Sequence, residues 1–189
     1  MQINIKADVS QALRENEANR KRVLQAAVRS LNRTADQVRT AGVKSISAEL
    51  GTKQKTVREQ LRVIRATRSK LASIVVGTGK AIGLIHFHAR QTAAGVVVTL
   101  YGKKKLFKGA FIQTMPGGHR GIFRRRHGTG WSKGRPRTSS PNLPIREMWG
   151  PGVPGTMASK HIFEALEKHA RTRWPINFAA DLKYYLNKP

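Results

Sequence analysis

The stretch that decides the fold is RKRVLQAAVRSLNRTADQVR, residues 20–39. Its apolar side chains recur at helical steps, and the opposite side carries arginines and lysines. The apolar set is Leu24, Ala27, Val28, Leu31, Ala35 and Val38. The basic set is Arg20, Lys21, Arg22, Arg29, Arg33 and Arg39. This pattern predicts an amphipathic helix with one buried face.

The predicted helix extends beyond this stretch at both ends. No proline interrupts residues 9–50, and Leu13 continues the apolar stripe. Asp8 and Ser10 are both candidate N-caps. A helix of this span would be about 60 Å long at about 1.5 Å per residue. Either Gly42 divides it into two helices, or its full length serves an assembly.

The flanking segments include both strands and helices. Residues 2–6 alternate polar and apolar side chains, which predicts a short strand. After Gly51 and the N-cap candidate Thr52, residues 53–63 predict a second helix. Three short segments rich in β-branched and aromatic residues then predict an antiparallel meander, over residues 71–76, 81–87 and 94–101.

A further hairpin and a long glycine- and proline-rich segment follow. Residues 109–113 and 121–125 predict the two strands of the hairpin, because the intervening Met115-Pro116-Gly117-Gly118 is a turn signal. Long stretches without regular structure are uncommon inside a compact domain and are usually functional or disordered. We therefore expect residues 124–151 to form an extended basic arm that a partner orders.

The C-terminal part of the chain returns to a helical pattern. Residues 157–171 predict one helix, and Pro175 suits the first turn of a last helix that ends near residue 186. We expect the apolar face of the long helix to pack on the meander, since matched apolar faces form an α+β layer. The sequence thus predicts a single α+β domain over residues 1–189. Its long N-terminal helix packs on an antiparallel β-sheet, with C-terminal helices and the basic arm.

The charge of the chain is its strongest global signal. The 189 residues include 36 lysines and arginines against 10 aspartates and glutamates, a formal net charge of +26. Residues 60–146 hold 18 of the basic residues and no acid. Self-repulsion at this charge disfavours the free compact protein, so we expect a polyanionic partner. A merely solvated surface would normally mix both signs.

Several classes of function lack the residues that they require. Without cysteine, disulfide scaffolds, thiolate zinc sites and cysteine nucleophiles are excluded. The acid-free segment has no carboxylate for catalysis, and His86 and His88 alone do not make a metal site. No apolar run approaches the roughly 18 residues that span a bilayer, and residues 1–6 lack a signal-peptide centre. We therefore expect no enzymatic activity, no cofactor and no membrane partner.

Two groups of residues are candidates for function. Basic side chains of the acid-free segment can neutralise phosphates without reading sequence. The DNA- or channel-facing candidates are Lys103, Lys104, Lys105, Lys108, Arg124, Arg125, Arg126, Lys133, Arg135 and Arg137. Large apolar residues in the arm have no core of their own to enter. The subunit-interface candidates are Trp131, Leu143, Pro144, Ile145, Met148 and Trp149.

Each group has an alternative role that the residues leave open. The basic residues could bind acidic loops of a neighbouring protein instead of DNA. The apolar residues could fold back on their own domain beside the helix predicted over residues 157–171.

Three motifs occur in a characteristic order and spacing. The first is LNRTA at residues 31–35, followed by KQKTVR at residues 53–58. The second is FKGAFI at residues 107–112, followed by MPGGHRGIFRR at residues 115–125. The third is LPIREMWGP at residues 143–151. From about residue 20 to residue 186, the chain resembles the minor tail protein Z, or tail completion protein, family of lambdoid siphophages.

The resemblance implies a structural virion protein in the neck of the phage tail, made in the cytoplasm of the host bacterium. It implies a homo-oligomeric ring, a hexamer, at the head-proximal end of a long non-contractile tail. The implied partners are the tail terminator, the head–tail connector or stopper protein, the tape measure protein and the end of the genomic DNA, bound without sequence specificity. The alternative is a free nucleic-acid-binding protein, RNA-associated or nucleoid-like, although such a protein does not need so long a helix.

Overall fold

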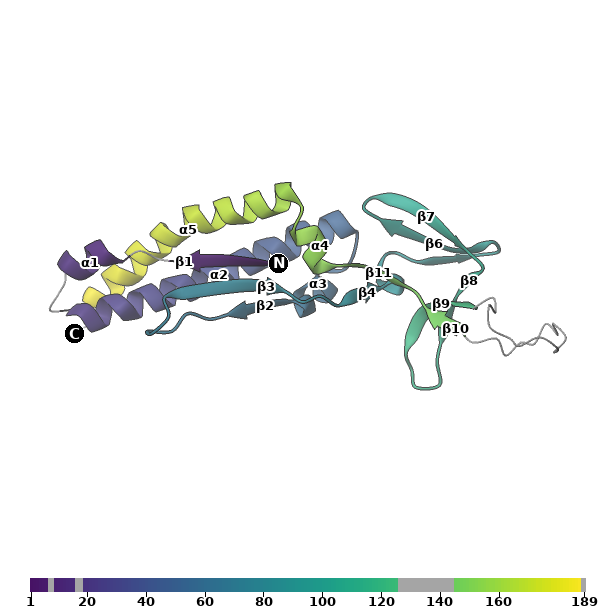
Figure 1. Ribbon diagram of the computed structural model, residues 1–189, viewed down its shortest axis with the longest axis horizontal. Coiled ribbons are helices and arrows are strands. Elements are labelled where there is room, and N and C mark those ends of the chain that lie inside the picture. Colours follow the sequence, from purple (N-terminus) through teal and green to yellow (C-terminus); the bar gives the residue numbers. More distant parts are fainter. Residues whose placement is uncertain (7–8, 16–18, 126–144, 188–189) are drawn as a thin grey trace, which may run out of the picture. The chain divides into compact units, whose positions relative to one another are not determined.

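The computed structural model describes residues 1–6, 9–15, 19–125 and 145–187 (Figure 1). The chain forms two compact units. The first contains Met1–Ala48, Gln54–Lys80 and Gly152–Pro189, and the second contains Glu49–Lys53 and Ala81–Pro151. The fold class is α+β, as the sequence predicted, with a long N-terminal helix, antiparallel sheets and C-terminal helices.

The long helix is α2 (Arg20–Leu50), and it continues through Gly42 without a break. The alternative in which Gly42 divides the helix is therefore wrong. A Cβ atom added at this position would lie 3.5 Å from Leu166 Cδ1 and 3.7 Å from Leu61 Cδ1. Gly42 is thus packed against two leucines from other elements. A separate short helix, α1 (Ser10–Glu15), precedes α2.

The predicted apolar face of α2 is only partly the buried one. Ala27, Leu31, Ala35 and Val38 are buried as expected, whereas Leu24 and Val28 are half-buried. The buried stripe also includes residues that the prediction omitted, namely Val23, Ala26, Val43, Ile46 and Leu50. The buried stripe is thus shifted toward Val23 and Ala26 and continues beyond Val38 to the end of the helix.

The sheet against α2 has three strands in the order β1-β3-β2. These are β1 (Gln2–Lys6), β2 (Leu61–Ile64) and β3 (Ala72–Gly77), all antiparallel. β3 pairs on both edges, with Ile3 and Val63 both opposite Val75. Since neither edge of β3 is free, the predicted single meander over residues 71–101 is wrong. The later strands belong to other sheets.

The helix predicted over residues 53–63 is shorter than expected. Helix α3 spans Gln54–Gln60 and ends where β2 begins. Leu61 and Val63 instead pair with Gly77 and Val75 of β3, so sheet pairing overrides the helical pattern there. The hydroxyl of Thr52, the predicted N-cap residue, donates to the carbonyl of His86 at 3.0 Å, and the helix begins two residues later at Gln54.

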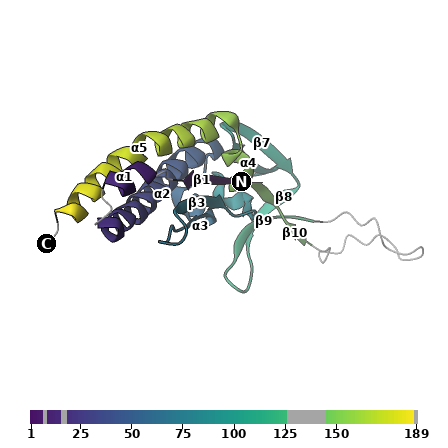
Figure 2. The same ribbon diagram turned by 60° about the vertical axis from the view of Figure 1, so that its left-hand side comes forward.

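The two C-terminal helices predicted from the sequence are one helix, α5 (Lys160–Leu186), with Pro175 inside it. A proline removes one helical hydrogen bond and crowds the preceding turn. Burial on both sides of Pro175 holds the helix together, with Leu166 and Ala170 before it and Asn177 and Asp181 after it. α5 follows the short α4 (Val153–Met157) and lies alongside α2 (Figures 1 and 2). Asn177 of α5 donates its side-chain Nδ2 proton to Thr34 Oγ1 of α2 at 2.9 Å.

The second unit consists of short strands in three sheets, ordered β5-β6-β7, β10-β9-β8 and β11-β4. The first sheet contains β5 (Arg90–Thr92), β6 (Gly95–Leu100) and β7 (Lys103–Lys108). The second contains β8 (Ala110–Thr114), β9 (Arg120–Arg125) and β10 (Ile145–Glu147). The third contains β4 (Ala81–Gly83) and β11 (Trp149–Gly152), and a short 3-10 turn, Leu84–His86, follows β4.

This unit confirms one sequence prediction and corrects two. The hairpin is confirmed as β8 and β9, with Phe111 opposite Phe123. The lysine run, to which the sequence analysis assigned no strand, is the strand β7, paired with β6 along its length. Residues 145–151, assigned to the extended arm, are strands β10 and β11 paired with β9 and β4, so these residues are ordered without a partner. Residues 126–144 of the arm lie outside the described residues.

The core of the first unit predicts a large effect of Leu31→Ala. Leu31 is fully buried on α2, so the substitution should lower the free energy of unfolding by about 2–5 kcal/mol through reduced burial and a cavity. Thermal or denaturant unfolding measures this. Leu24→Ala is the matched control, because the same atoms are removed from a half-buried site on the same helix. Equal effects of the two changes would contradict the packing of α2.

The continuity of α2 predicts that Gly42→Ala stabilises the protein. Alanine is about 1 kcal/mol more favourable than glycine inside a helix, and an added Cβ would make ordinary contacts with Leu61 and Leu166. The melting temperature should therefore rise. Gly42→Leu should lower it, because the larger side chain would collide with the same leucines. A lower melting temperature for Gly42→Ala would show that the space is too tight.

Candidate nucleic-acid interface

The lysines of β7 lie on both faces of their sheet. Lys103, Lys104, Lys105 and Lys108 are all exposed. Successive side chains of a strand point to opposite faces. The even-numbered lysines therefore share one face and the odd-numbered lysines the other. The four lysines cannot all face one partner across a single face of the sheet.

The face with Lys103 and Lys105 is largely covered within the unit. Lys105 is opposite Val98 on β6, and the neighbouring Val96 shares this face. Both valines are fully buried. The Lys105 ammonium lies 5.5 Å from the centroid of the Phe107 ring, a favourable cation–π geometry. These two lysines therefore stand beside packed apolar side chains.

The face with Lys104 and Lys108 is the open one. Val97 on this face is half-buried, and its partner Leu106 is 41% exposed. Val97 is also paired with Arg90 of β5, across the other edge of β6. Arg90 therefore adds a third exposed cation to the same face. We call this surface the open face, defined by Arg90, Lys104 and Lys108 around Val97 and Leu106. An apolar centre ringed by cations suits a polyanion that also presents apolar groups.

A pair of arginines faces each other across the neighbouring sheet. Arg124 of β9 lies directly opposite Arg146 of β10, and both side chains are exposed. Like charges in opposite positions of an antiparallel pair repel and destabilise the sheet. An anion bound between them would relieve this repulsion. The next residue, Arg125, points to the other face, and its guanidinium lies 5.5 Å from the centroid of the Phe111 ring.

The acid nearest to these arginines in sequence is already engaged. Glu147 Oε1 lies 2.8 Å from Nε2 of His119 in the turn between β8 and β9. The carboxylate also packs over Gly121, where an added Cβ would come within 2.8 Å of the same oxygen. Glu147 is thus held by the hairpin and does not neutralise the arginine pair.

Comparison with known protein families identifies the chain. The family model of prophage minor tail protein Z matches residues 7–188. The chain belongs to this family. No curated protein and no solved structure matches the chain.

Membership of the minor tail protein Z family confirms the resemblance inferred from the three motifs. The protein is therefore a structural component of a phage tail, located in the virion. None of the described residues form a group of three or more histidines, aspartates or glutamates that could hold a metal ion. Within the described part of the chain, no helix has the length and apolar character needed to cross a membrane.

The structure describes only some of the predicted site residues. Lys103, Lys104, Lys105, Lys108, Arg124 and Arg125 lie on β7 and β9 as discussed above. Five other candidates lie outside the described residues with the rest of that segment, namely Arg126, Trp131, Lys133, Arg135 and Arg137. Leu143 and Pro144 lie outside them too.

The interface candidates on β10, on β11 and at Met148 between them differ from one another in exposure. Ile145 is 40% exposed and Trp149 is 55% exposed, whereas Met148 is half-buried. The backbone of Met148 is tied to its own unit, since its N–H donates to Ile122 and its carbonyl accepts from Leu84. Of the described interface candidates, Trp149 therefore has the largest exposed fraction that a partner could bury.

Arg90 is a basic site residue that the sequence reasoning missed. Its strand, Arg90–Thr92, is only three residues long and gives too short a pattern for a prediction. The sequence signal that could have indicated this strand is Arg90 and Thr92, two residues apart on either side of Gln91. The side-chain oxygen of Gln91 accepts a hydrogen bond from the backbone N–H of Ile112 at 2.8 Å. This bond joins β5 to the outer edge of β8.

The arginine pair predicts that Arg146→Gln stabilises the protein at low salt. Removing one of two opposed like charges should raise the free energy of unfolding by about 0.2–1 kcal/mol. Because salt screens exposed charges, the gain should shrink as ionic strength rises. Melting temperatures across a salt series measure both effects. Arg120→Gln is the control, since Arg120 lies opposite the uncharged Thr114. A gain of equal size in the control would mean that only net charge matters.

Proposed function

We propose that the protein is a ring component of the phage neck that completes the head-proximal end of the tail. In this role it joins the tail terminator to the head–tail connector and surrounds the end of the genome. Membership of a tail-protein family and a net charge of +26 support the proposal. A ring closes on itself through heterologous contacts, in which two different patches of each subunit meet. The tape measure protein is a further proposed neighbour.

The observation that carries the DNA contact is the open face. Arg90, Lys104 and Lys108 are exposed there with no acidic residue in their strands. Lysine and arginine bind phosphates through charge alone, which matches a DNA end held without sequence specificity. The opposed Arg124 and Arg146 add a second place where a phosphate would be stabilising. Of the β7 lysines, Lys104 and Lys108 therefore remain the DNA-facing candidates.

A proposed subunit contact involves β10 and β11. Trp149 and Ile145 expose large apolar side chains, and tryptophan is a common interface anchor because it buries much area at little entropic cost. We assign these residues to the contact with a neighbouring subunit, within a ring of six. A protein that acts alone on nucleic acid would gain nothing from this exposure, so the free nucleic-acid-binding alternative is disfavoured.

The open face predicts which lysines matter for DNA binding. Lys104→Gln with Lys108→Gln should weaken duplex binding by the full chain. The slope of log K against log salt should become shallower by about 0.9 for each phosphate that the protein no longer neutralises. Lys103→Gln with Lys105→Gln is matched in charge and lies on the same strand, and its effect should be smaller. Titration of a labelled duplex at several salt concentrations gives both slopes.

Three outcomes would overturn this assignment. Equal weakening in the two double variants would show that the face of the sheet is irrelevant. Unchanged DNA binding by the Lys104 and Lys108 variant, with failure to join tails, would instead show that the lysines bind acidic loops of a neighbouring ring. Virions that carry the variant and retain their genomes normally would also exclude the DNA role.

The exposed tryptophan predicts a defect in assembly. Trp149→Ala should reduce incorporation of the protein into purified tails by at least tenfold, because interface hot spots cost about 2 kcal/mol or more when truncated. The melting temperature of the free chain should change little, since Trp149 is 55% exposed. Ile176→Ala on α5 is the control for removal of an equally exposed apolar side chain. Normal incorporation of Trp149→Ala would exclude this residue from the interface.

A further inference from the structure

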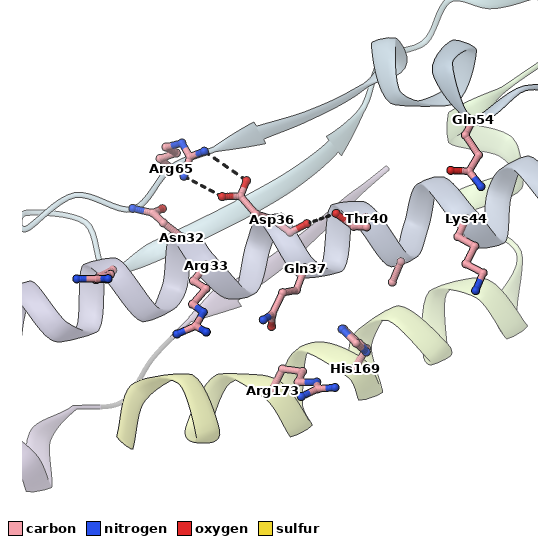
Figure 3. Close-up of a pocket in the computed structure, with 12 residues that line it drawn as sticks. Asn32, Arg33, Asp36, Gln37, Thr40, Lys44, Gln54, Arg65, His169 and Arg173 are labelled. Atoms are coloured by element: carbon pink, nitrogen blue, oxygen red, sulfur yellow. Dashed lines mark hydrogen bonds and ion pairs between the residues drawn. The ribbon is translucent and has the colours of Figure 1, made fainter. Parts of the chain in front are cut away.

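A groove lined mainly by polar and charged residues lies in the first unit, between α2 and α5 (Figure 3). It has a volume of about 930 Å³. Its walls come from one side of α2 and the facing side of α5, with additions from α3 and from the residue after β2. The lining residues are Arg29, Asn32, Arg33, Asp36, Gln37, Thr40, Ala41, Lys44, Gln54, Arg65, His169 and Arg173. These residues are distinct from the basic residues that the sequence predicted to face DNA.

The groove carries positive charge that nothing in the described chain neutralises. Asp36 is the one acid among the described lining residues, and both of its oxygens bind the Arg65 guanidinium, at 3.2 and 3.3 Å. Arg33, Lys44 and Arg173 are exposed and have no acidic side chain within ion-pair distance among the described residues. Figure 3 places Arg33 and Lys44 on α2 and Arg173 on the facing α5. A ligand for this groove is therefore anionic.

Hydrogen bonds hold the floor of the groove in place. Asn177 Nδ2 lies 3.0 Å from Gln37 Oε1 and donates to it, which leaves the Gln37 amide nitrogen free to donate to a ligand. The Thr40 hydroxyl donates to the backbone carbonyl of Asp36 at 2.9 Å, so its oxygen can still accept. The Gln54 side-chain amide can both donate and accept. The groove thus offers neutral donors and acceptors between its cations.

This combination fits a peptide better than a nucleic acid. Sites for single-stranded nucleic acid typically stack bases on aromatic side chains, and the described lining of the groove includes no phenylalanine, tyrosine or tryptophan. Phosphodiesters accept hydrogen bonds but do not donate them. The acceptor oxygens of Thr40 and Gln54 would therefore find no donor in the sugar–phosphate linkages of a nucleic acid. An extended peptide presents N–H groups and carbonyls in alternation. Its carboxylates would pair with Arg33, Lys44 and Arg173.

We propose that the groove between α2 and α5 binds an acidic, extended peptide segment of a partner protein. Arg33 and Arg173 hold carboxylates from opposite walls, and Lys44 holds a further one along α2. Gln37, Thr40 and Gln54 bind the peptide backbone. This contact is separate from the DNA-facing role proposed for β7, and it holds whether or not the protein occupies the neck. It gives the first unit a partner of its own.

The test uses the full chain and a labelled peptide. The probe is a short fluorescein-labelled peptide of alternating glutamate and serine, and binding is followed by fluorescence anisotropy. The groove variant combines Arg33→Gln, Lys44→Gln and Arg173→Gln. The control variant combines Lys21→Gln, Lys168→Gln and Lys183→Gln, which removes the same charge from exposed positions of α2 and α5 outside the groove. Thermal unfolding of both variants checks that each remains folded.

The expected result is a reduction in affinity of about tenfold or more in the groove variant and less than about threefold in the control. Similar reductions in both variants would overturn the proposal, because general charge would then explain the binding. Absence of peptide binding by the unmodified chain would also overturn it. A labelled oligothymidylate of the same length tests the other occupant. If its binding falls in the groove variant and not in the control, the groove is a nucleic-acid site and the proposal is wrong.

Discussion

The first unit depends on the burial of α2 from two sides at once. Apolar residues such as Leu31 and Val38 are fully buried on this helix, and its polar residues bond outward to both neighbours. On the sheet side, Asn32 Oδ1 accepts from the backbone N–H of Ala66 at 2.8 Å and from Ser73 Oγ at 2.9 Å. On the other side, Thr34 accepts from Asn177 of α5. Rotation of α2 about its axis would break the hydrogen bonds on both sides. The orientation of α2 therefore fixes how the sheet and α5 are placed relative to each other.

Local patterns in the sequence predicted the helices and several strands, because helical spacing and strand alternation are visible within a few residues. The pairing of strands was not predictable in this way. β1 and β2 flank β3, although β1 ends at Lys6 and β2 begins only at Leu61, after the whole of α2 and α3. Pro175 was misleading for a related reason, since burial of residues on both sides outweighs the local cost of proline.

The sequence predicted which basic residues belong to the candidate site, but it only partly predicted how they are arranged in space. The lysines of β7 were identified by the lack of acids around them, but the run of like charges hid the strand that β6 pairs with. Alternation along that strand then divides the lysines between two faces, a distinction that composition cannot supply. β7 is also an edge strand, and lysines at an edge discourage unwanted pairing with other sheets. The charges of the α2–α5 groove were visible only as the solvated side of an amphipathic helix.

The points where the chain leaves and re-enters the first unit lie next to each other. A Cβ atom built on Gly152 would come 2.8 Å from the backbone carbonyl oxygen of Lys80. Apart from residues 49–53, the second unit is thus an insertion whose two ends meet at one place. Insertions of this kind leave the host fold intact when their ends are close. Exchange of the inserted unit would therefore change the strands of the second unit and leave the helical scaffold of the first unit unchanged.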